Sequence, residues 1–412
     1  MENSNTQTIE KQFSYIENGS ITSPIGISAS GIHCGLKKKK KDLALIVSKE
    51  FAEVAGTFTT NKAQAAPVII DKKIIDSGTK VKAMIINSAY ANACTGDEGF
   101  IDALEIQEKT AHTLSILPSE LLISSTGLIG ERIPVSKVTS SLNELVYKLA
   151  DDGGIDAANA IMTTDLMPKH FGLTVQLSKG AVTIGGIAKG SGMIHPNMAT
   201  MLGFVTTDAK FSKSLLQTTL TNTVNNSFNK ISVDGETSTN DMVLLMANGM
   251  SNVEITEDTN DYQIFSEALQ DLTQSMAKSI VADGEGATKF ITINIKNAQT
   301  EKDANKIAEA IAISPLVKTA MNGNDPNWGR IISAASSSGA EIVPEKLSLY
   351  FGDLQILQPG YKSVFTEEEA VNVLKEKEII ITLDLLDGTA NTTWWTCDYS
   401  EQYIKINSQY RT

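Results

Sequence analysis

Residues 185–202 read Gly-Gly-Ile-Ala-Lys-Gly-Ser-Gly-Met-Ile-His-Pro-Asn-Met-Ala-Thr-Met-Leu and constrain the fold more than any other segment. Four glycines fall within eight residues, directly after a strand-like run. Glycine permits backbone conformations and close approaches that a side chain would prevent. After Thr200 the sequence becomes apolar again, as expected of a buried strand. We therefore expect a tight, irregular loop between two buried strands, with Thr200 at the junction.

A threonine at such a junction can carry an uncommon reaction. Its hydroxyl can attack the carbonyl of Ala199 and take over the acyl group, and hydrolysis of that ester leaves Thr200 as a new N-terminus. A free α-amine has a reference pKa of about 7.7–8.0, so it can act as the base for the hydroxyl of the same residue. The same composition is also typical of an ordinary glycine-rich turn. Composition by itself favours this ordinary turn over a self-cleaving loop.

Strand-like and helix-like segments alternate along the chain. Short apolar runs predict strands at residues 43–47, 82–87, 172–177, 181–187, 241–246, 290–295, 347–351 and 379–383. Apolar residues at helical spacing predict helices at residues 101–117, 138–149, 216–228 and 265–280. Adjacent Trp394 and Trp395 point to opposite faces of a strand, which favours core and interface packing over ligand stacking. Without a regular strand-helix-strand cadence, these segments predict a layered α+β fold.

The charge balance excludes several classes of protein. In 412 residues, 48 acidic and 35 basic side chains leave a formal net charge of −13, a poor match for nucleic acid. No apolar run reaches the roughly 18 residues that spanning a bilayer requires, and residues 1–11 lack a secretory pattern. Cys34, Cys94 and Cys397 are scattered, as in proteins of a reducing compartment. We therefore expect a cytoplasmic protein that binds neither nucleic acid nor membrane.

The sequence also lacks the usual metal motifs. The four histidines lie far apart, and there is no HExxH, CxxC or EF-hand pattern, so we expect no bound metal. Asp234, Glu236 and Asp241 have no standard metal spacing, and we expect them to be structural. The lysine run at residues 37–41 is expected to form a solvated turn.

The segment from Lys189 to Leu202 resembles the self-cleavage motif of the ornithine acetyltransferases, or glutamate N-acetyltransferases, of arginine biosynthesis. Further blocks match in order at residues 56–61 (Gly-Thr-Phe-Thr-Thr-Asn), 91–96 (Ala-Asn-Ala-Cys-Thr-Gly), 125–130 (Ser-Thr-Gly-Leu-Ile-Gly), 162–165 (Met-Thr-Thr-Asp), 232–241 (Ser-Val-Asp-Gly-Glu-Thr-Ser-Thr-Asn-Asp), 283–289 (Asp-Gly-Glu-Gly-Ala-Thr-Lys) and 325–330 (Asp-Pro-Asn-Trp-Gly-Arg). The resemblance implies a two-domain α+β fold in which helices flank stacked β-sheets. It also implies self-cleavage into an alpha subchain, residues 1–199, and a beta subchain, residues 200–412.

The resemblance further implies a role for individual residues. Thr200 would be the nucleophile, both for cleavage of the Ala199–Thr200 bond and for acyl transfer, and Thr126 and Gly127 would form the oxyanion hole. The positions that would contact substrate are Thr163, Lys189, Thr200, Glu285, Asn407 and Thr412. Within this set Lys189 suits a carboxylate and Glu285 suits an ammonium group.

By the same resemblance, we expect a ping-pong acyltransferase of arginine biosynthesis. N2-acetylornithine would acetylate Thr200, and glutamate would take the acetyl group to give N-acetylglutamate. The cycle needs no cofactor, and acetyl-CoA is a further donor in some family members. The family also implies a heterotetramer of two alpha and two beta subchains.

Three alternatives stay open on the sequence alone. A related self-processing N-terminal-threonine amidase or aminopeptidase would use water as the acceptor, and an uncleaved binding module would use the glycine loop to hold a ligand. A paralogue that serves a secondary pathway is the third, because Ala89-Tyr90 and Ser336 depart from the usual family pattern.

Overall fold

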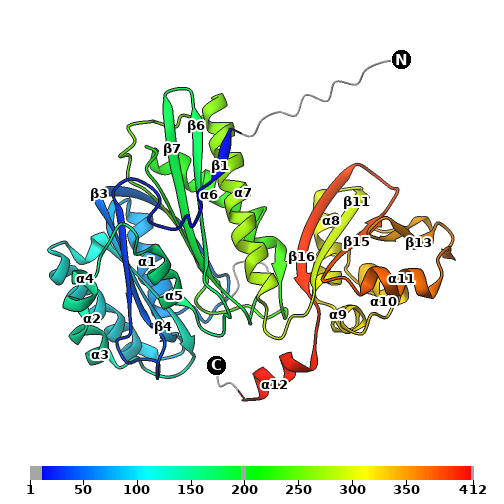
Figure 1. The fold of residues 1–412 in the computed structure, drawn as a ribbon, viewed down its shortest axis with the longest axis horizontal. Helices are drawn as coiled ribbons and strands as arrows, with labels where there is room; N and C mark the ends of the chain where they lie inside the picture. Colours follow the sequence, from blue (N-terminus) through cyan, green and yellow to red (C-terminus); the bar gives the residue numbers. More distant parts are fainter. Residues whose placement is uncertain (1–11, 196–200, 410–412) are drawn as a thin grey trace.

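The computed structural model describes residues 12–195 and 201–409, which form two β-sheets flanked by helices (Figure 1). This arrangement confirms the α+β fold that the sequence predicts. Ala199, Thr200 and Thr412 lie outside the described residues. No helix in the described ranges combines the length and hydropathy that a membrane span requires.

The larger sheet contains strands from the first 247 residues. Its order is β1-β6-β7-β8-β10-β3-β4-β5, with β2 paired to β3 outside this path. The strand bounds are β1 Phe13–Tyr15, β2 Ile27–Ile32, β3 Leu43–Phe58, β4 Val81–Tyr90, β5 Leu121–Leu128, β6 Lys169–Leu177, β7 Gly180–Lys189, β8 Leu202–Thr207 and β10 Met242–Ala247. β8 is fully buried and pairs with β7 and β10, as expected for the apolar run after Thr200.

Helices cover the larger sheet and its loops (Figure 1). Their bounds are α1 Ala66–Ser77, α2 Gly96–Leu114, α3 Val135–Ser140, α4 Leu142–Tyr147, α5 Gly154–Ile161, α6 Lys213–Asn225 and α7 Asn260–Ala282, with 3₁₀ turns at Pro118–Glu120 and Phe228–Lys230. The single helix predicted at residues 138–149 is wrong, because α3 ends at Ser140 and α4 begins at Leu142, with Ser141 between them. The hydroxyl of Ser141 donates to the carbonyl of Lys137, a local bond that competes with helix continuation.

The smaller sheet belongs to the C-terminal part of the chain, with β9 from the middle of the sequence at one edge. Its order is β14-β13-β12-β15-β11-β16-β9. The bounds are β9 Ile231–Ser232, β11 Phe290–Ala298, β12 Ser348–Phe351, β13 Leu354–Gln358, β14 Lys362–Ser363, β15 Glu378–Asp384 and β16 Ala390–Cys397. The accompanying helices are α8 Glu301–Ile313, α9 Pro315–Asn322, α10 Trp328–Ser336 and α11 Glu367–Leu374, with a 3₁₀ turn at Pro344–Lys346.

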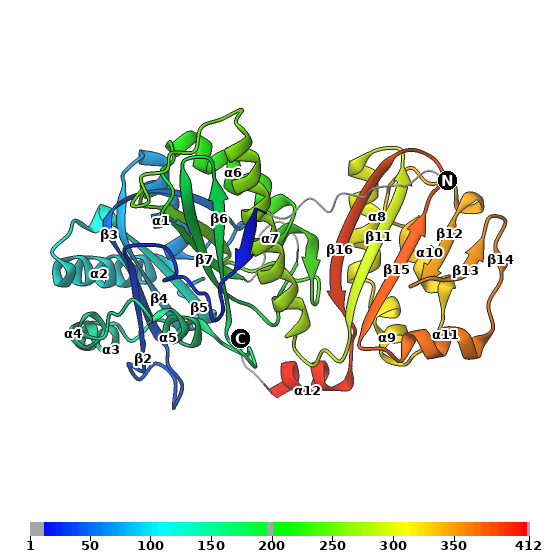
Figure 2. The ribbon, with the colours of Figure 1, turned by 45° about the horizontal axis from the view of Figure 1, so that its top comes forward.

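The two sheets are joined through a shared packing interface at β16. Trp394 belongs to the hydrophobic cluster of the C-terminal part, whereas Trp395 belongs to the cluster formed by α6, α7 and the centre of the larger sheet. This division confirms that neighbouring tryptophans of one strand serve opposite faces. Figure 2 shows α7 of the central part lying beside β16.

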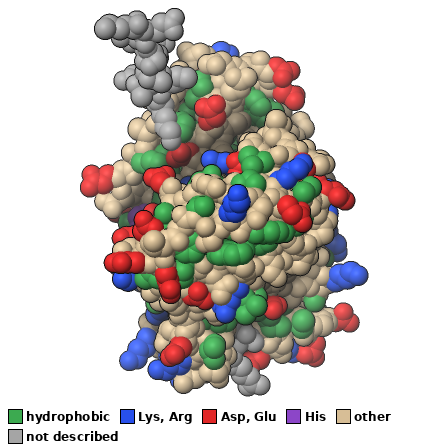
Figure 3. Space-filling model, turned by 90° about the vertical axis from the view of Figure 1, so that its right-hand side faces the viewer, with side chains coloured by type: hydrophobic (Ala, Val, Ile, Leu, Met, Phe, Trp, Pro, Cys, Tyr) green, Lys and Arg blue, Asp and Glu red, His purple; other side chains and the backbone are tan. Residues whose placement is uncertain are grey.

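The last helix, α12 (Glu401–Gln409), leaves the C-terminal part and lies below the junction of the two sheets (Figures 1 and 2). None of its residues is fully buried, so side-chain bonds to the rest of the fold decide where it lies. On the end of the molecule formed by the C-terminal part, acidic and basic side chains are interspersed around hydrophobic ones (Figure 3). The excess of acidic residues therefore produces no single-sign patch on that face.

Candidate active site

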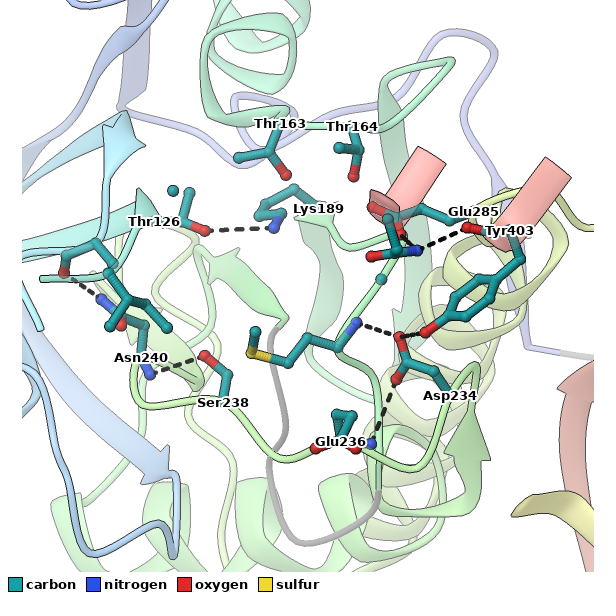
Figure 4. A pocket seen from close by; sticks show the side chains of 16 residues that line it. Thr126, Thr163, Thr164, Lys189, Asp234, Glu236, Ser238, Asn240, Glu285 and Tyr403 are labelled. Carbon is teal, nitrogen blue, oxygen red and sulfur yellow. Dashed lines mark hydrogen bonds between the residues drawn. The ribbon is translucent and has the colours of Figure 1, made fainter. Parts of the chain in front are cut away.

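A pocket collects most of the residues that the family resemblance singles out (Figure 4). Its lining consists of Ala91, Thr126, Gly127, Ile129, Thr163, Thr164, Lys189, Gly192, Met193, Asp234, Glu236, Ser238, Asn240, Glu285, Tyr403 and Asn407. Of the predicted substrate contacts, Thr163, Lys189, Glu285 and Asn407 meet here, together with Thr126 and Gly127. Thr200 and Thr412 are outside the described residues, as is the Ala199–Thr200 bond.

The pocket exists because the larger sheet folds over on itself. Strands β7 and β5 are five positions apart in the sheet order, which in a flat sheet would separate them by roughly 24 Å. Yet Nζ of Lys189, at the end of β7, lies 3.3 Å from Oγ1 of Thr126, near the end of β5. The long strand β3 shifts register between Val47 and Ala52, and this irregularity lies between the two halves of the sheet.

Gly127 follows Thr126 near the end of β5, next to β4. Strands β4 and β5 are parallel, and Ala89 is the partner of Gly127 in this ladder. The φ angle of Gly127 is +128°, and a Cβ there would lie 2.2 Å from the backbone carbonyl of Ala89. Only glycine fits this backbone, and both Thr126 and Gly127 line the pocket.

Lys189 is the positively charged side chain of the pocket wall, and it is only 2% exposed. Burial lowers its pKa, while the carboxylates of Asp165, Asp241 and Glu285 oppose this effect. Because an ammonium group only donates, Thr126 accepts the bond from Lys189. The hydroxyl hydrogen of Thr126 is therefore available for another acceptor.

A buried Asp165–Lys169–Asp283 network lies behind this wall. Nζ of Lys169 contacts Oδ1 of Asp165 at 2.7 Å and Oδ2 of Asp283 at 2.6 Å, with all three side chains nearly inaccessible. Burial would raise the pKa of Asp165, but Lys169 and Lys189 lower it to about 2. The two carboxylates of the network are thus neutralised by two ammonium groups, that of Lys169 within the network and that of Lys189 beside it.

The same network holds three separate segments of the pocket. Asp165 accepts hydrogen bonds from the backbone N–H groups of Thr163 and Gly190, at 2.9 and 2.8 Å. The hydroxyl of Ser191 donates a hydrogen bond to the backbone carbonyl of Asp283. The backbone carbonyl of Ser191 in turn accepts a hydrogen bond from the N–H of Glu285. Thr163, Lys189 and Glu285 are therefore positioned by one connected set of buried bonds.

Asp234 links the glycine-rich loop to the C-terminal helix. Its carboxylate accepts the N–H groups of Met193 and Ile194 at 2.6 and 2.8 Å, and it also accepts the hydroxyl of Tyr403 at 3.3 Å. Met193 has a φ of +57°, which is unusual for a side chain of this kind, so these bonds hold a strained turn. From the same helix as Tyr403, Nδ2 of Asn407 donates to Oε2 of Glu285 at 2.8 Å.

The region before β10 supplies another side of the pocket. Nδ2 of Asn240 donates to the carbonyls of Ala91 and Ser125, which brings this loop against the end of β5. Both carboxyl oxygens of the neighbouring Asp241 are buried without a hydrogen-bond partner among the described residues. Burial raises the pKa of Asp241 well above its usual range, although Lys189 acts in the opposite direction.

Sequence reasoning missed several of these residues as parts of the site. Asp165 and Asp283 stand in blocks noted for family resemblance, and the resemblance gave neither a role. Lys169 and Tyr403 lie in no such block, so no sequence signal marks them. The structural role predicted for Asp234 is confirmed, because backbone N–H groups occupy its oxygens. Glu285 is only 7% exposed and lines the pocket, so it is not a solvated surface acid.

Comparison with known proteins gives a consistent result. The ArgJ family model matches residues 28–412. The arginine biosynthesis bifunctional protein ArgJ of Caldanaerobacter subterraneus subsp. tengcongensis is 46% identical over 402 residues, which cover 96% of this chain and 100% of that protein. The protein of the same name from Oceanobacillus iheyensis is 44% identical over 406 residues, covering 98% and 99%. A crystal structure of ArgJ from Bacillus halodurans is 43% identical with a TM-score of 0.44, over 45% of this chain and 98% of that one.

Proposed function

The chain belongs to the ArgJ family and is an acyltransferase, and on this premise we propose that it transfers the acetyl group of N2-acetylornithine to glutamate through an ester on Thr200. The observation that carries the proposal is the pocket in which a buried lysine, a buried glutamate and a Thr-Gly turn face one another. Such a set of groups suits an amino acid whose acyl carbonyl must be attacked.

Autocatalytic cleavage comes first in the proposed sequence. The hydroxyl of Thr200 attacks the carbonyl of Ala199, and water hydrolyses the resulting ester to free the α-amine of Thr200. The described chain resumes at Met201, and β8 begins at Leu202 directly opposite Lys189 in the ladder with β7. Because β7 and β8 are adjacent antiparallel strands, an alpha subchain 1–199 and a beta subchain 200–412 would stay joined after cleavage.

Acyl transfer then proceeds in two half-reactions. The α-amine of Thr200 takes the hydroxyl proton as Oγ1 attacks the acetyl carbon of N2-acetylornithine, and the proton passes to ornithine as its C–N bond breaks. The neutral amino group of glutamate then attacks the acetyl carbon of the ester. Its proton passes through the α-amine of Thr200 to Oγ1 as the acyl C–O bond breaks, which releases N-acetylglutamate and restores the free hydroxyl. In both tetrahedral intermediates, the hydroxyl of Thr126 and the N–H of Gly127 stabilise the negative oxygen.

Substrate binding follows the charges of the pocket. We assign Lys189 to a substrate carboxylate and Glu285 to the side-chain ammonium of ornithine, with Asn407 fixing the orientation of Glu285. Thr163 and Thr412 contribute neutral hydrogen bonds in this assignment. Glutamate has no side-chain ammonium, so donor and acceptor overlap in their shared α-amino-acid part.

Two assays test this proposal. Ornithine release from N2-acetylornithine should require glutamate and yield an equal amount of N-acetylglutamate. Equal release without glutamate would instead support an amidase that uses water. Denaturing electrophoresis should give two bands, and the larger fragment, residues 200–412, should begin with Thr200. The variant Thr200→Ala should give one inactive full-length chain.

Two finer points of the proposal concern the second donor and the assembly. The relatives are named bifunctional, and we propose acetyl-CoA as the alternative acetyl donor. Formation of N-acetylglutamate from acetyl-CoA and glutamate checks this directly. We also propose an assembly of two alpha and two beta subchains, for which native mass spectrometry should show twice the mass of one cleaved pair.

A further inference from the structure

The lysine run at residues 37–41 contains one side chain that does not behave as a solvated turn predicts. Lys38, Lys39 and Lys40 are exposed, whereas Lys37 turns inward. Nζ of Lys37 donates to Oγ of Ser88 at 2.6 Å, to the carbonyl of Met162 at 2.5 Å and to the carbonyl of Lys41 at 3.1 Å. Three acceptors satisfy all three hydrogens of the ammonium group.

Two of these acceptors lie directly beside proposed site residues. Ser88 is the ladder partner of Thr126 in the parallel pair of β4 and β5, so Lys37 contacts the strand next to the Thr126-Gly127 turn. Met162 precedes Thr163, whose N–H is held by Asp165. A single ammonium group therefore joins the backing of the oxyanion-hole turn to the loop that carries Thr163.

Asp42 fixes the loop from which Lys37 extends. Its fully buried carboxylate accepts the N–H groups of Cys34 and Lys37, at 2.6 and 2.7 Å. The charged groups that act on Lys37 are Asp42 and Lys40 of its own loop, together with Lys189 of the pocket wall and Asp165 behind it. Burial lowers the pKa of Lys37 to about 8, with Asp42 acting in the opposite direction.

We propose that Lys37 is a positioning residue for acetyl transfer, because its ammonium group holds the Thr126-Gly127 turn and the Thr163 loop in their relative places. It acts through Ser88 and the carbonyl of Met162, without touching substrate. The inference rests on the acetyl transfer proposed above. Misplacement of the oxyanion donors weakens the transition state more than substrate binding, so kcat should fall. Thr163 contributes only one neutral hydrogen bond to the substrate in the proposed assignment, so a shift of its loop should raise KM little.

The test compares Lys37→Met and Lys37→Arg with Lys38→Met, which removes the same group from the neighbouring exposed position. The assay is acetyl transfer from N2-acetylornithine to glutamate by the full chain, with kcat and KM measured separately and folding followed by circular dichroism. Lys37→Met should lower kcat at least about tenfold, with KM changed less than about threefold. Lys37→Arg should recover most of kcat, and Lys38→Met should match the wild type.

A folded Lys37→Met protein with the kcat of Lys38→Met would overturn the inference. So would equal losses in kcat and in the affinity for both substrates, which indicate a general structural role. If Lys37→Met does not fold, Lys37→Gln is measured in its place, because its side-chain NH2 group keeps two of the three N–H donors without the charge. A folded Lys37→Gln protein with the kcat of Lys38→Met would likewise overturn the inference. Absence of transfer in the wild type would instead refute the proposed function, so the two failures are distinguishable.

Discussion

Nζ of Lys189 donates a hydrogen bond to Oγ1 of Thr126 across 3.3 Å, although 63 residues separate them in the chain. The bond joins the ends of two strands that are far apart in the order of one sheet. It holds a cation and a hydroxyl group side by side at the wall of a pocket, which is the arrangement that the proposed carboxylate binding and oxyanion stabilisation require.

Thr126→Val tests the hydroxyl of this pair. The substitution keeps the shape of the side chain and removes the donor, so kcat for acetyl transfer should fall about 10²- to 10³-fold. Thr126→Ser keeps the hydroxyl and should retain most of the activity. Steady-state kinetics provide the check, and a Thr126→Val enzyme with normal kcat would remove Thr126 from the oxyanion hole.

Gly127→Ala should destabilise the protein because the new Cβ meets the carbonyl of Ala89 at 2.2 Å. The unfavourable φ and the clash together should cost about 2 kcal/mol or more in the free energy of unfolding. Gly130→Ala is the matched control, since its φ is +80° but no atom lies within 4 Å of the new Cβ. Urea unfolding of the two variants should therefore differ, and equal midpoints would show that the contact with Ala89 relaxes freely.

Lys169→Met removes the cation from between Asp165 and Asp283. Two buried carboxylates would remain without their counter-charge, so the variant should lose about 3–5 kcal/mol of stability. Adding Asp283→Asn removes one of these charges and should restore part of the loss. Denaturant titration of both variants measures their free energies of unfolding, and the double variant should be the more stable of the two. A double variant less stable than Lys169→Met would contradict the charge argument.

Asp71 predicts a pH dependence of stability. Burial raises its pKa well above the usual range, although the N–H of Ile123 acts against this, and its second oxygen has no partner among the described residues. Above the ordinary pKa of about 3.9, the folded state keeps a proton that the unfolded state has lost, so stability falls as pH rises.

Asp71→Asn should remove that contribution while keeping an oxygen for the N–H of Ile123. The stability of the variant relative to the wild type should therefore increase with pH above about 4, by at most about 1.4 kcal/mol per pH unit. Thermal or urea unfolding between pH 4 and 8 measures the difference. A difference that stays constant with pH would show that Asp71 ionises normally.

In the wild type, Nδ2 of Asn407 donates a hydrogen bond to Oε2 of Glu285. The substitution Asn407→Asp replaces this donor with a second carboxylate. Repulsion should displace α12 or Glu285 and raise KM for N2-acetylornithine at least about tenfold, since a lost bond to a charged group costs about 1.5–3 kcal/mol. Gln409→Glu makes the same charge change at an exposed position of the same helix. Its KM should stay near the wild-type value, and equal effects of both variants would indicate only a general charge effect.

Local sequence patterns predicted most of the regular structure that surrounds the site. The apolar runs at residues 82–87 and 290–295 are strands β4 and β11, and helical spacing at residues 265–280 falls within α7. Apolar periodicity works there because each element buries one continuous face or run. It failed at Ser141, where a side-chain bond to a nearby carbonyl outweighs the apolar spacing. The solvated turn predicted from the charge run at residues 37–41 is wrong for Lys37, whose ammonium group bonds to Ser88 and to the carbonyl of Met162, because nothing in the sequence distinguishes it from the four lysines that follow.

The sequence by itself determined the family, the α+β class and the candidates Thr126, Gly127, Thr163, Lys189, Glu285 and Asn407, because these depend on the order of residue types along the chain. Only the tertiary structure decided that these residues share one pocket, and that Asp165, Lys169, Asp234 and Lys37 hold its walls. Those partners come together because one sheet folds over on itself, and because the final helix contacts Asp234 and Glu285 through Tyr403 and Asn407. Buried charges and amide groups are then satisfied by whichever segments meet there, and no local pattern encodes such meetings.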